Sequence, residues 1–372
     1  MQQLHKKRIV TAFFFFVVLL QSSNVWAQEG DKDVFPPDSY YKAKVIGIVE
    51  VHDKERVQAS EIVQQLRLSI LDGEKKGIEV VAQNNIPSNR QSQQKVSIGD
   101  RVVVVESYGV DGRGYYVVDA YRIPSLFILL FFFVALAIFF GRVRGFSSLI
   151  GLAFSILILA WYVVPRIALG HDPLSTSISG ALVILVVSLY LAHGFTRRTS
   201  VALLSSFITL ILSSLLAILF VSISHLFGTG TEDALFLQLS GDQAINVKGL
   251  LLGGIIIGML GVLDDITIGQ TVTIDELHKA NTQLTSKELY RRGLSVGREH
   301  IASLVNTLAL AYAGVALPLF LLFSLNATGQ PLWVVMNNEA LAEEIVRTLI
   351  GSCALILAVP ISTFLAASFL RK

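Results

Sequence analysis

Two adjacent carboxylates, Asp264 and Asp265, stand inside an apolar run and are the residues of this sequence best suited to chemistry. The run begins at Leu250, and apolar side chains continue after the pair from Ile266 to Ile268. Ionisable side chains inside a membrane span are costly, and they mark ion, proton or substrate pathways by default. The pair therefore indicates a site for a cation or a proton. The competing interpretation is a pair of acids that only ends a helix at the membrane interface.

A stripe of glycines leads to one of these two acids. On a helix, Gly254, Gly258, Gly261 and Asp265 share one face, whereas Asp264 lies about 100° away. Glycine stripes let helices approach closely in lipid. We therefore expect the three glycines to pack against a neighbouring helix and Asp265 to point into the bundle. This geometry favours Asp265 over Asp264 as the functional acid.

The composition and the spacing of apolar blocks predict a polytopic α-helical membrane protein. Hydrophobic residues make up 53% of the 372 residues and charged residues 16%, whereas soluble domains carry about 25% charged residues. The apolar residues cluster in blocks of roughly twenty, the length of a transmembrane helix. About seven spans are predicted, near residues 125–140, 146–164, 174–193, 200–222, 249–268, 300–324 and 345–368.

The first third of the chain is of a different kind. Basic residues at 5–8, a short apolar run and the sequence Val25-Trp26-Ala27 predict a signal peptide over residues 1–27. An uncleaved anchor is the alternative, although an apolar run of about twelve residues is short for a span. Residues 28–123 alternate apolar and polar residues between turns, which predicts an extracytoplasmic small β-barrel, OB-like, of about five strands. Residues 124–372 form the transmembrane helical domain.

Charge in the short loops predicts the orientation. With the β domain outside, nearly all loop lysines and arginines fall inside, as the positive-inside rule requires. The outside loops hold essentially only Arg166, with Lys248 at a membrane edge. We therefore expect a multi-pass protein of the bacterial inner membrane with a cytoplasmic C-terminus. The basic residues of the inside loops are Arg142, Arg144, Arg197, Arg198, Lys279, Lys287, Arg291, Arg292, Arg298, Arg371 and Lys372.

Several kinds of chemistry find no support in the sequence. Cys353 is the single cysteine, so the chain forms no intramolecular disulfide. An intramembrane aspartyl protease needs two facing carboxylates, and the side chains of Asp264 and Asp265 diverge. A His-Glu-x-x-His zinc motif and a phosphate-binding loop are both absent from the sequence. We expect no enzyme, no cofactor and no nucleic-acid partner. The identity of any metal and the oligomeric state stay open.

The motifs resemble those of the YibE/F-like family of bacterial multi-pass membrane proteins. The resemblance covers roughly the whole chain and is strongest over residues 250–320. It implies this architecture but no activity, because the molecular function of the family is uncharacterised. The family usually has Asp before the motif histidine, where this chain has Glu299. The matching segments are Gly258 to Gln270, Arg292-Gly293, Gly297 to Ile301, Asn306 to Leu308, Ala311 to Gly314, and Pro318.

Stripe and motif together give one set of candidate residues for an ion or substrate pathway. Arg298 is included because a cation would relieve the unfavourable field of a helix C-terminus on the acids. Asn306 has a structural alternative, since an amide inside a span usually bonds a neighbouring helix. The set comprises Asp265, Asp264, Thr267, Gln270, Arg298, His300 and Asn306.

Two functions are consistent with these features. The first is a transporter or permease with an ion- or proton-linked acidic site at the end of the span 249–268. The second is a membrane scaffold or regulatory protein whose exported β domain binds a protein partner. In both, the lipid bilayer surrounds the helices.

Overall fold

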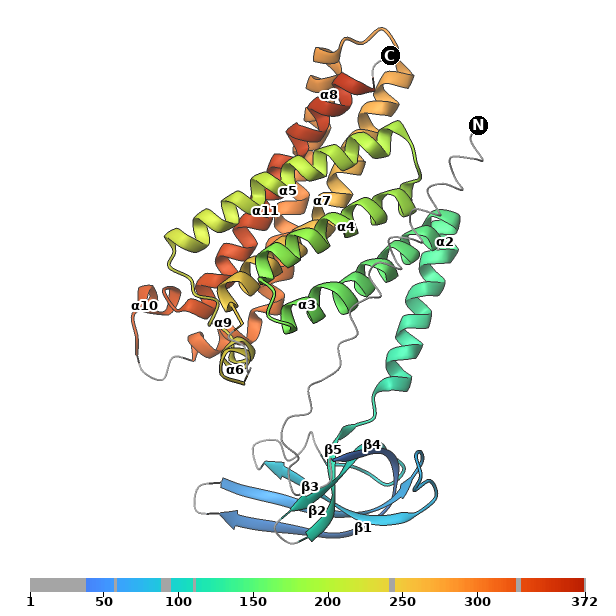
Figure 1. Cartoon of the computed structure of the whole chain (residues 1–372), viewed down its shortest axis with the longest axis vertical. Helices are drawn as coiled ribbons and strands as arrows, with labels where there is room; N and C mark the ends of the chain where they lie inside the picture. The colour runs from blue at the N-terminus through green and yellow to red at the C-terminus, as the bar shows by residue number, and fades with distance from the viewer. Residues whose placement is uncertain are drawn as a thin grey trace. The chain divides into compact units, whose positions relative to one another are not determined.

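The computed structural model describes residues 38–56, 59–87, 95–109, 112–240, 245–325 and 329–370. The chain divides into two compact units, one built mainly of strands and one of helices (Figure 1). The predicted signal peptide lies outside the described residues. The last strand ends at Ala120 and the first described helix begins at Ile123.

The strand unit is a closed five-stranded barrel, which confirms the predicted barrel. Around it the order is β1-β2-β3-β5-β4, and every pairing is antiparallel except the parallel pair β3–β5. Two irregularities in β1, after Val45 and after Ile48, let this 18-residue strand bend and pair with both β2 and β4. The strands are β1 (Ser39–Arg56), β2 (Ala59–Ile70), β3 (Glu79–Pro87), β4 (Arg101–Gly109) and β5 (Gly112–Ala120).

A buried carboxylate ties the barrel together at Glu106 of β4, whose side chain is only 3% exposed. Lys75 donates to both of its carboxylate oxygens at 2.6 Å, and the hydroxyls of Tyr115 and Tyr41 donate at 2.9 and 3.2 Å. Arg113 forms an ion pair with the same carboxylate. Burial by itself raises the pKa of Glu106, but hydrogen bonds from Arg113, Lys75 and Tyr115 outweigh it and lower the pKa to about 2.

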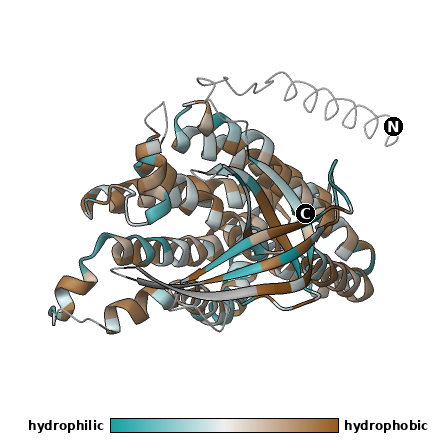
Figure 2. Cartoon of the chain, turned by 90° about the horizontal axis from the view of Figure 1, so that it is seen from below, coloured by the Kyte–Doolittle hydropathy of each residue, from teal (hydrophilic) through white to brown (hydrophobic). Residues whose placement is uncertain are grey.

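The described residues of the helical unit contain five stretches that are long and apolar enough to cross a membrane, or six if the bent pair α8–α9 counts as one span. Hydrophobic residues cover much of these helices (Figure 2). The elements are α2 (Ile123–Ile158), the π-helical turn η2 (Leu159–Val163), α3 (Val164–Ala168), α4 (Pro173–His193), α5 (Arg197–Ile223), α6 (Glu232–Ser240), α7 (Val247–Ala280), α8 (Ser286–Val315), α9 (Leu317–Ser324), α10 (Leu332–Met336) and α11 (Glu339–Phe369).

The difference from the predicted seven spans lies mainly in residues 123–168. By length and composition these residues count as one membrane-crossing stretch, whereas two spans were predicted there. Within α2 the backbone leaves the helix at Arg142 (φ 51°, ψ −134°). A Cβ atom at Gly145 would overlap the carbonyl oxygen of Ala137. In a continuous helix, residues eight apart are about 12 Å apart along the axis. The chain therefore turns sharply at Arg142, in the loop predicted between the first two spans, while the count of seven stays a prediction.

Helix α7 is the centre of the helical unit. It packs against α4, α5, α8 and α11. Its large apolar side chains Ile255, Ile256, Met259 and Leu263 are almost completely buried in the main hydrophobic cluster. Because α7 has neighbours on several sides, the direction of each polar side chain on it decides which helix that side chain meets.

The Glu106 network yields a stability prediction for the barrel. Replacement of Glu106 by Gln (Glu106→Gln) removes the buried anion that Lys75, Arg113 and two tyrosines share, and we expect the barrel to lose about 1–3 kcal/mol of unfolding free energy. Hydrogen exchange of β4 amides in the full-length protein measures this loss. The exposed Glu79, on β3 of the same barrel, is the matched control, and Glu79→Gln should change exchange little.

The same network sets the direction of the pH dependence. The pKa of Glu106 falls from 4.5 to about 2 on folding, so its stabilising contribution is complete above pH 4.5 and is lost as the pH drops toward 2. Barrel exchange in the parent should therefore accelerate over this interval, and less so in Glu106→Gln. Equal acceleration in both proteins would contradict the assignment.

Candidate functional site

The paired acids of α7 occupy different surroundings, and the structure reverses their expected order. Asp264 is partly buried, and its Oδ2 accepts a hydrogen bond of 3.1 Å from the hydroxyl of Ser188 on α4. Its Oδ1 is buried and has no hydrogen-bond partner in the described part of the chain. Asp265 is exposed. The prediction that Asp265 points into the bundle is therefore wrong, and Asp264 is the inward acid.

Within the single chain, the glycine stripe makes little of the expected helix contact, and its packing between two copies stays a prediction. A Cβ atom added at Gly254 or Gly261 would meet no described atom within 4 Å, and at Gly258 it would meet only the hydroxyl of Tyr312, at 3.4 Å. All three glycines are exposed in the single chain. The physical reason is that a glycine stripe can be either a contact or an open groove, since glycine itself contributes no apolar surface.

The close approach of α7 to α4 occurs one residue earlier, at Gly253. A Cβ atom there would overlap the hydroxyl oxygen of Ser177, which is itself buried. This contact turns the Asp264 side of α7 toward Ser188 of α4 and leaves the Asp265 side outside. Ser177 and Ser188 carried no signal in the sequence beyond being serines in an apolar span.

Thr267 and Gln270 both lie in the interior, each fully buried. The hydroxyl of Thr267 is 2.7 Å from that of Ser206 on α5. The amide nitrogen of Gln270 donates to the hydroxyl of Thr363 on α11, at 3.1 Å, and to the carbonyl of Gly293 on α8, at 3.4 Å. The other amide atom, Oε1, is buried without a partner among the described residues. The structure thus assembles polar groups from four helices around this part of α7.

The candidates on α8 behave differently. Arg298, His300 and Asn306 are all exposed. The structure forms no ion pair between Arg298 and either acid of α7, although it describes all three residues. The amphipathic first half of α8 instead buries Gly293 and Gly297.

The two buried glycines of α8 are the close contacts that the sequence analysis did not recognise. A Cβ atom at Gly293 would overlap Ile274 of α7, and one at Gly297 would overlap the Gln270 amide. Their spacing of four residues is the small-xxx-small pattern, which could have identified them.

Within the described ranges, no group of three or more His, Cys, Asp or Glu side chains is arranged to hold a metal ion. A cation at Asp264 would therefore need hydroxyl, backbone or water oxygens as its other ligands. Such oxygens suit a hard cation or a proton better than a transition metal.

The family model described as YibE/F-like protein matches residues 129–372. The chain belongs to the YibE/F-like family. The match includes α7 and α8 but leaves the five strands outside. The resemblance was expected over roughly the whole chain, and the family match covers its helical part. No curated protein and no solved structure matches this YibE/F-like chain.

The glycine geometry gives a matched pair of substitutions on α7. Gly253→Ala places a methyl group against Ser177, and overpacking of this kind costs about 1–3 kcal/mol. Gly254→Ala enters open space and gains helix propensity, so it should be neutral or slightly stabilising. We expect the melting temperature of the purified full-length protein to fall for Gly253→Ala only. A larger fall for Gly254→Ala would show that the glycine stripe is the packed face after all.

Proposed function

We propose that this YibE/F-like protein is an inner-membrane permease in which Asp264 binds and releases a cation or a proton. The observation that carries the proposal is the buried Oδ1 of Asp264, which has no hydrogen-bond partner in the described chain. A buried acceptor left unpaired costs about 1–3 kcal/mol, and more when it is charged. A proton or a bound cation supplies the missing partner, and its release requires a route from the membrane interior.

Polar groups on α7 continue from Asp264 toward the predicted cytoplasmic end. Thr267 with Ser206 and Gln270 with Thr363 follow at intervals of three residues, about 4.5 Å each along the helix. Buried polar groups are expensive within a bilayer and are typical of ion and proton pathways. We therefore assign Thr267 and Gln270 to the same pathway as Asp264, and we assign no pathway role to the exposed Asp265.

The orientation belongs to the proposal as well. The bias of lysine and arginine toward one set of loops supports a barrel outside the cell membrane and a C-terminus in the cytoplasm. In this orientation the N-terminus of α7 faces outward, and Asp264 lies near the middle of α7.

A second function, as a scaffold or regulator, is favoured by the barrel. A polar cavity of about 500 Å³ in that unit is lined by residues that include Asn84, Arg101, Asp119 and Tyr121. Such a surface suits an extracytoplasmic partner and has no role in an ion pathway along α7. If it is the essential part, Arg101→Ala should impair function while the response of the protein to ions stays unchanged.

Asp264→Asn and Asp265→Asn form the matched pair that tests the permease. The melting temperature of the full-length protein is measured across mono- and divalent cations and across pH. A ligand that binds only the folded state raises the melting temperature as its concentration increases. We expect at least one cation, or a pH change above 4.5 where the contribution of Glu106 is constant, to shift the parent and Asp265→Asn, and to leave Asp264→Asn unshifted.

Two results would count against the proposal. If no cation and no pH change shifts the parent, the pathway loses its support. If Asp265→Asn alone abolishes the shift, the exposed acid is the functional one. A positive result leads to flux measurements in liposomes, where Asp264→Asn should reduce the ion-dependent flux at least tenfold.

The proposed orientation has its own test. In a Cys353→Ser background, a cysteine introduced at Glu74 of the barrel should react with a membrane-impermeant maleimide added outside spheroplasts. A cysteine introduced at Lys279, at the end of α7, should react only after the membrane is opened. The reverse pattern would invert the topology.

A further inference from the structure

The five-stranded barrel is open along part of one seam, the one between β3 and β5. These two strands pair at only two positions, the second of which sets Gln83 opposite Tyr116, although both strands continue over residues 84–87 and 117–120. In this continuation β3 keeps β2 as its neighbour on one side, and β5 keeps β4. On the other side, neither strand pairs with a described strand. The barrel therefore has two unpaired strand edges that begin at the same seam.

A cavity of about 500 Å³ lies where the two strands diverge. It is lined by Asn84 and Asn85 of β3 and by residues 117–120 of β5. Its volume is within the range of ligand-binding pockets, about 300–1,000 Å³. Val102, in the barrel core, and Val117, packed against that core, give the cavity an apolar part. The two unpaired edges thus border one open space.

The charged side chains around this cavity leave positive charge available. Of its two acids, Asp119 is paired with Arg122 at 2.5 Å, and Asp100 accepts a hydrogen bond of 2.8 Å from the backbone amide three residues earlier. Lys95 and Arg101 also line the cavity, are exposed, and form no ion pair with a residue that the structure describes. A negatively charged ligand would therefore meet two cations that have no partner of their own.

Together these features select an extended peptide with acidic side chains. Unpaired strand edges present alternating N–H and C=O groups, which another peptide backbone satisfies when it is added as a strand. Carboxylates on the added strand meet Lys95 and Arg101, while its apolar side chains contact Val102 and Val117. A nucleic acid would satisfy the cations but not the strand edges. We propose that the seam between β3 and β5 binds an extended, acidic segment of a protein partner.

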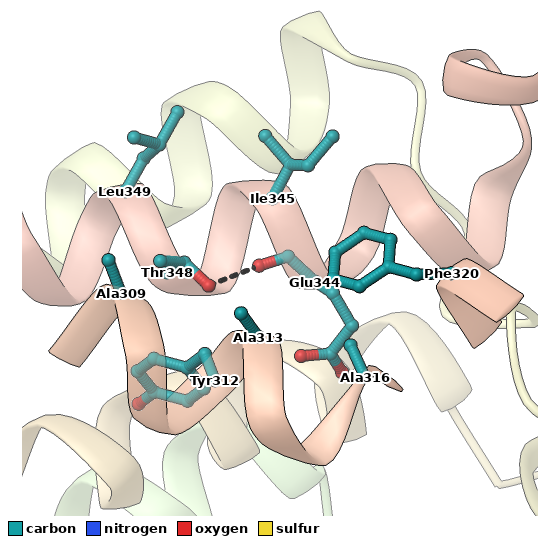
Figure 3. Close-up of a pocket in the computed structure, with 9 residues that line it drawn as sticks. All are labelled: Ala309, Tyr312, Ala313, Ala316, Phe320, Glu344, Ile345, Thr348 and Leu349. Carbon is teal, nitrogen blue, oxygen red and sulfur yellow. Dashed lines mark hydrogen bonds between the residues drawn. The ribbon is translucent and has the colours of Figure 1, made fainter. Parts of the chain in front are cut away.

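The cavity at the break between α8 and α9, in the helical unit, lacks both features. It measures about 220 Å³, and the axes of the two helices differ there by 63° (Figure 3). Its lining is almost entirely apolar and includes three alanines of α8 and the break, Ala309, Ala313 and Ala316. The acid in this lining, Glu344, accepts a hydrogen bond of 2.7 Å from Arg347, so its charge is already paired. Only the barrel seam offers unpaired cations beside unpaired backbone groups.

Binding is tested by fluorescence anisotropy on the purified full-length protein. The probe is a fluorescein-labelled octapeptide of alternating valine and glutamate. We expect saturable binding that weakens as the salt concentration rises, because the ionic contacts are made by exposed cations. The same peptide with lysine in place of glutamate should bind at least tenfold more weakly. Equal binding of the two peptides would contradict a role for the cations.

Methylation of alternate backbone nitrogens in the probe separates strand addition from charge attraction. The methylated peptide keeps every carboxylate but loses the N–H donors along one of its edges. We expect its affinity to fall at least tenfold. An unchanged affinity would show that the seam attracts carboxylates without adding a strand, and it would overturn the proposal.

Lys95→Gln and Arg101→Gln test the location, and Lys76→Gln, at an exposed lysine of the same barrel outside the cavity lining, is the matched control. All three side chains are exposed, so the substitutions leave the fold intact. Each seam variant should weaken binding of the acidic peptide, and the double variant at least tenfold, whereas Lys76→Gln should bind as the parent does. No binding by the parent, or binding that survives the double substitution, would overturn the proposal.

Peptide binding at the seam identifies the partner of the second proposed function and rests on that function, yet the two fail separately. Impaired function in Arg101→Ala without peptide binding would keep the barrel as a partner surface and remove the added strand. Peptide binding without impaired function would keep the seam as a peptide site and remove the scaffold as the essential role. Asp264→Asn should bind the peptide normally, since the pathway on α7 shares no residue with the seam.

Discussion

The contact between Gly253 of α7 and Ser177 of α4 is the constraint on which the helical unit depends. The side chain of Ser177 occupies the space in which a Cβ atom at Gly253 would stand, so the two helices approach closely at this point. This approach fixes the rotation of α7 about its own axis. The rotation then determines which of two adjacent acids faces Ser188 and which faces outward, and it directs Thr267 toward α5 and Gln270 toward α8 and α11.

The surrounding lipid makes the rotation of α7 about its axis important for the polar side chains on this helix. Lipid offers no hydrogen bonds, so every polar side chain within a span must find its partner in the protein or in a ligand. Most buried hydroxyls of this unit donate to the carbonyl four residues earlier on their own helix, as Thr209, Thr267 and Thr363 do. The atoms left over are informative against this background. Oδ1 of Asp264 and Oε1 of Gln270 are among the buried atoms without a partner in the described chain, and both belong to the proposed pathway.

In the barrel, by contrast, the buried acid finds all of its hydrogen-bond partners within the protein. Its buried carboxylate, Glu106, is surrounded by donors from Lys75, Arg113, Tyr41 and Tyr115, so no acceptor capacity is left for a ligand. We regard Glu106 as a structural group that holds together a small barrel without disulfides. A fully satisfied buried acid and a half-satisfied one thus have different roles.

The sequence by itself determined the features that depend on local composition. Apolar blocks located the long helices, period-two alternation located a five-stranded barrel, and the acid pair located the unusual part of α7. It could not choose between Asp264 and Asp265, because neighbouring residues differ by about 100° on a helix and only the packed face distinguishes them. It could not recognise the surroundings of Glu344, which arise from the break at α8–α9 and from alanines 28 to 35 residues earlier in the chain. Only the tertiary structure decided which glycines touch a neighbour, since glycine has no side chain whose polarity or size could reveal its surroundings.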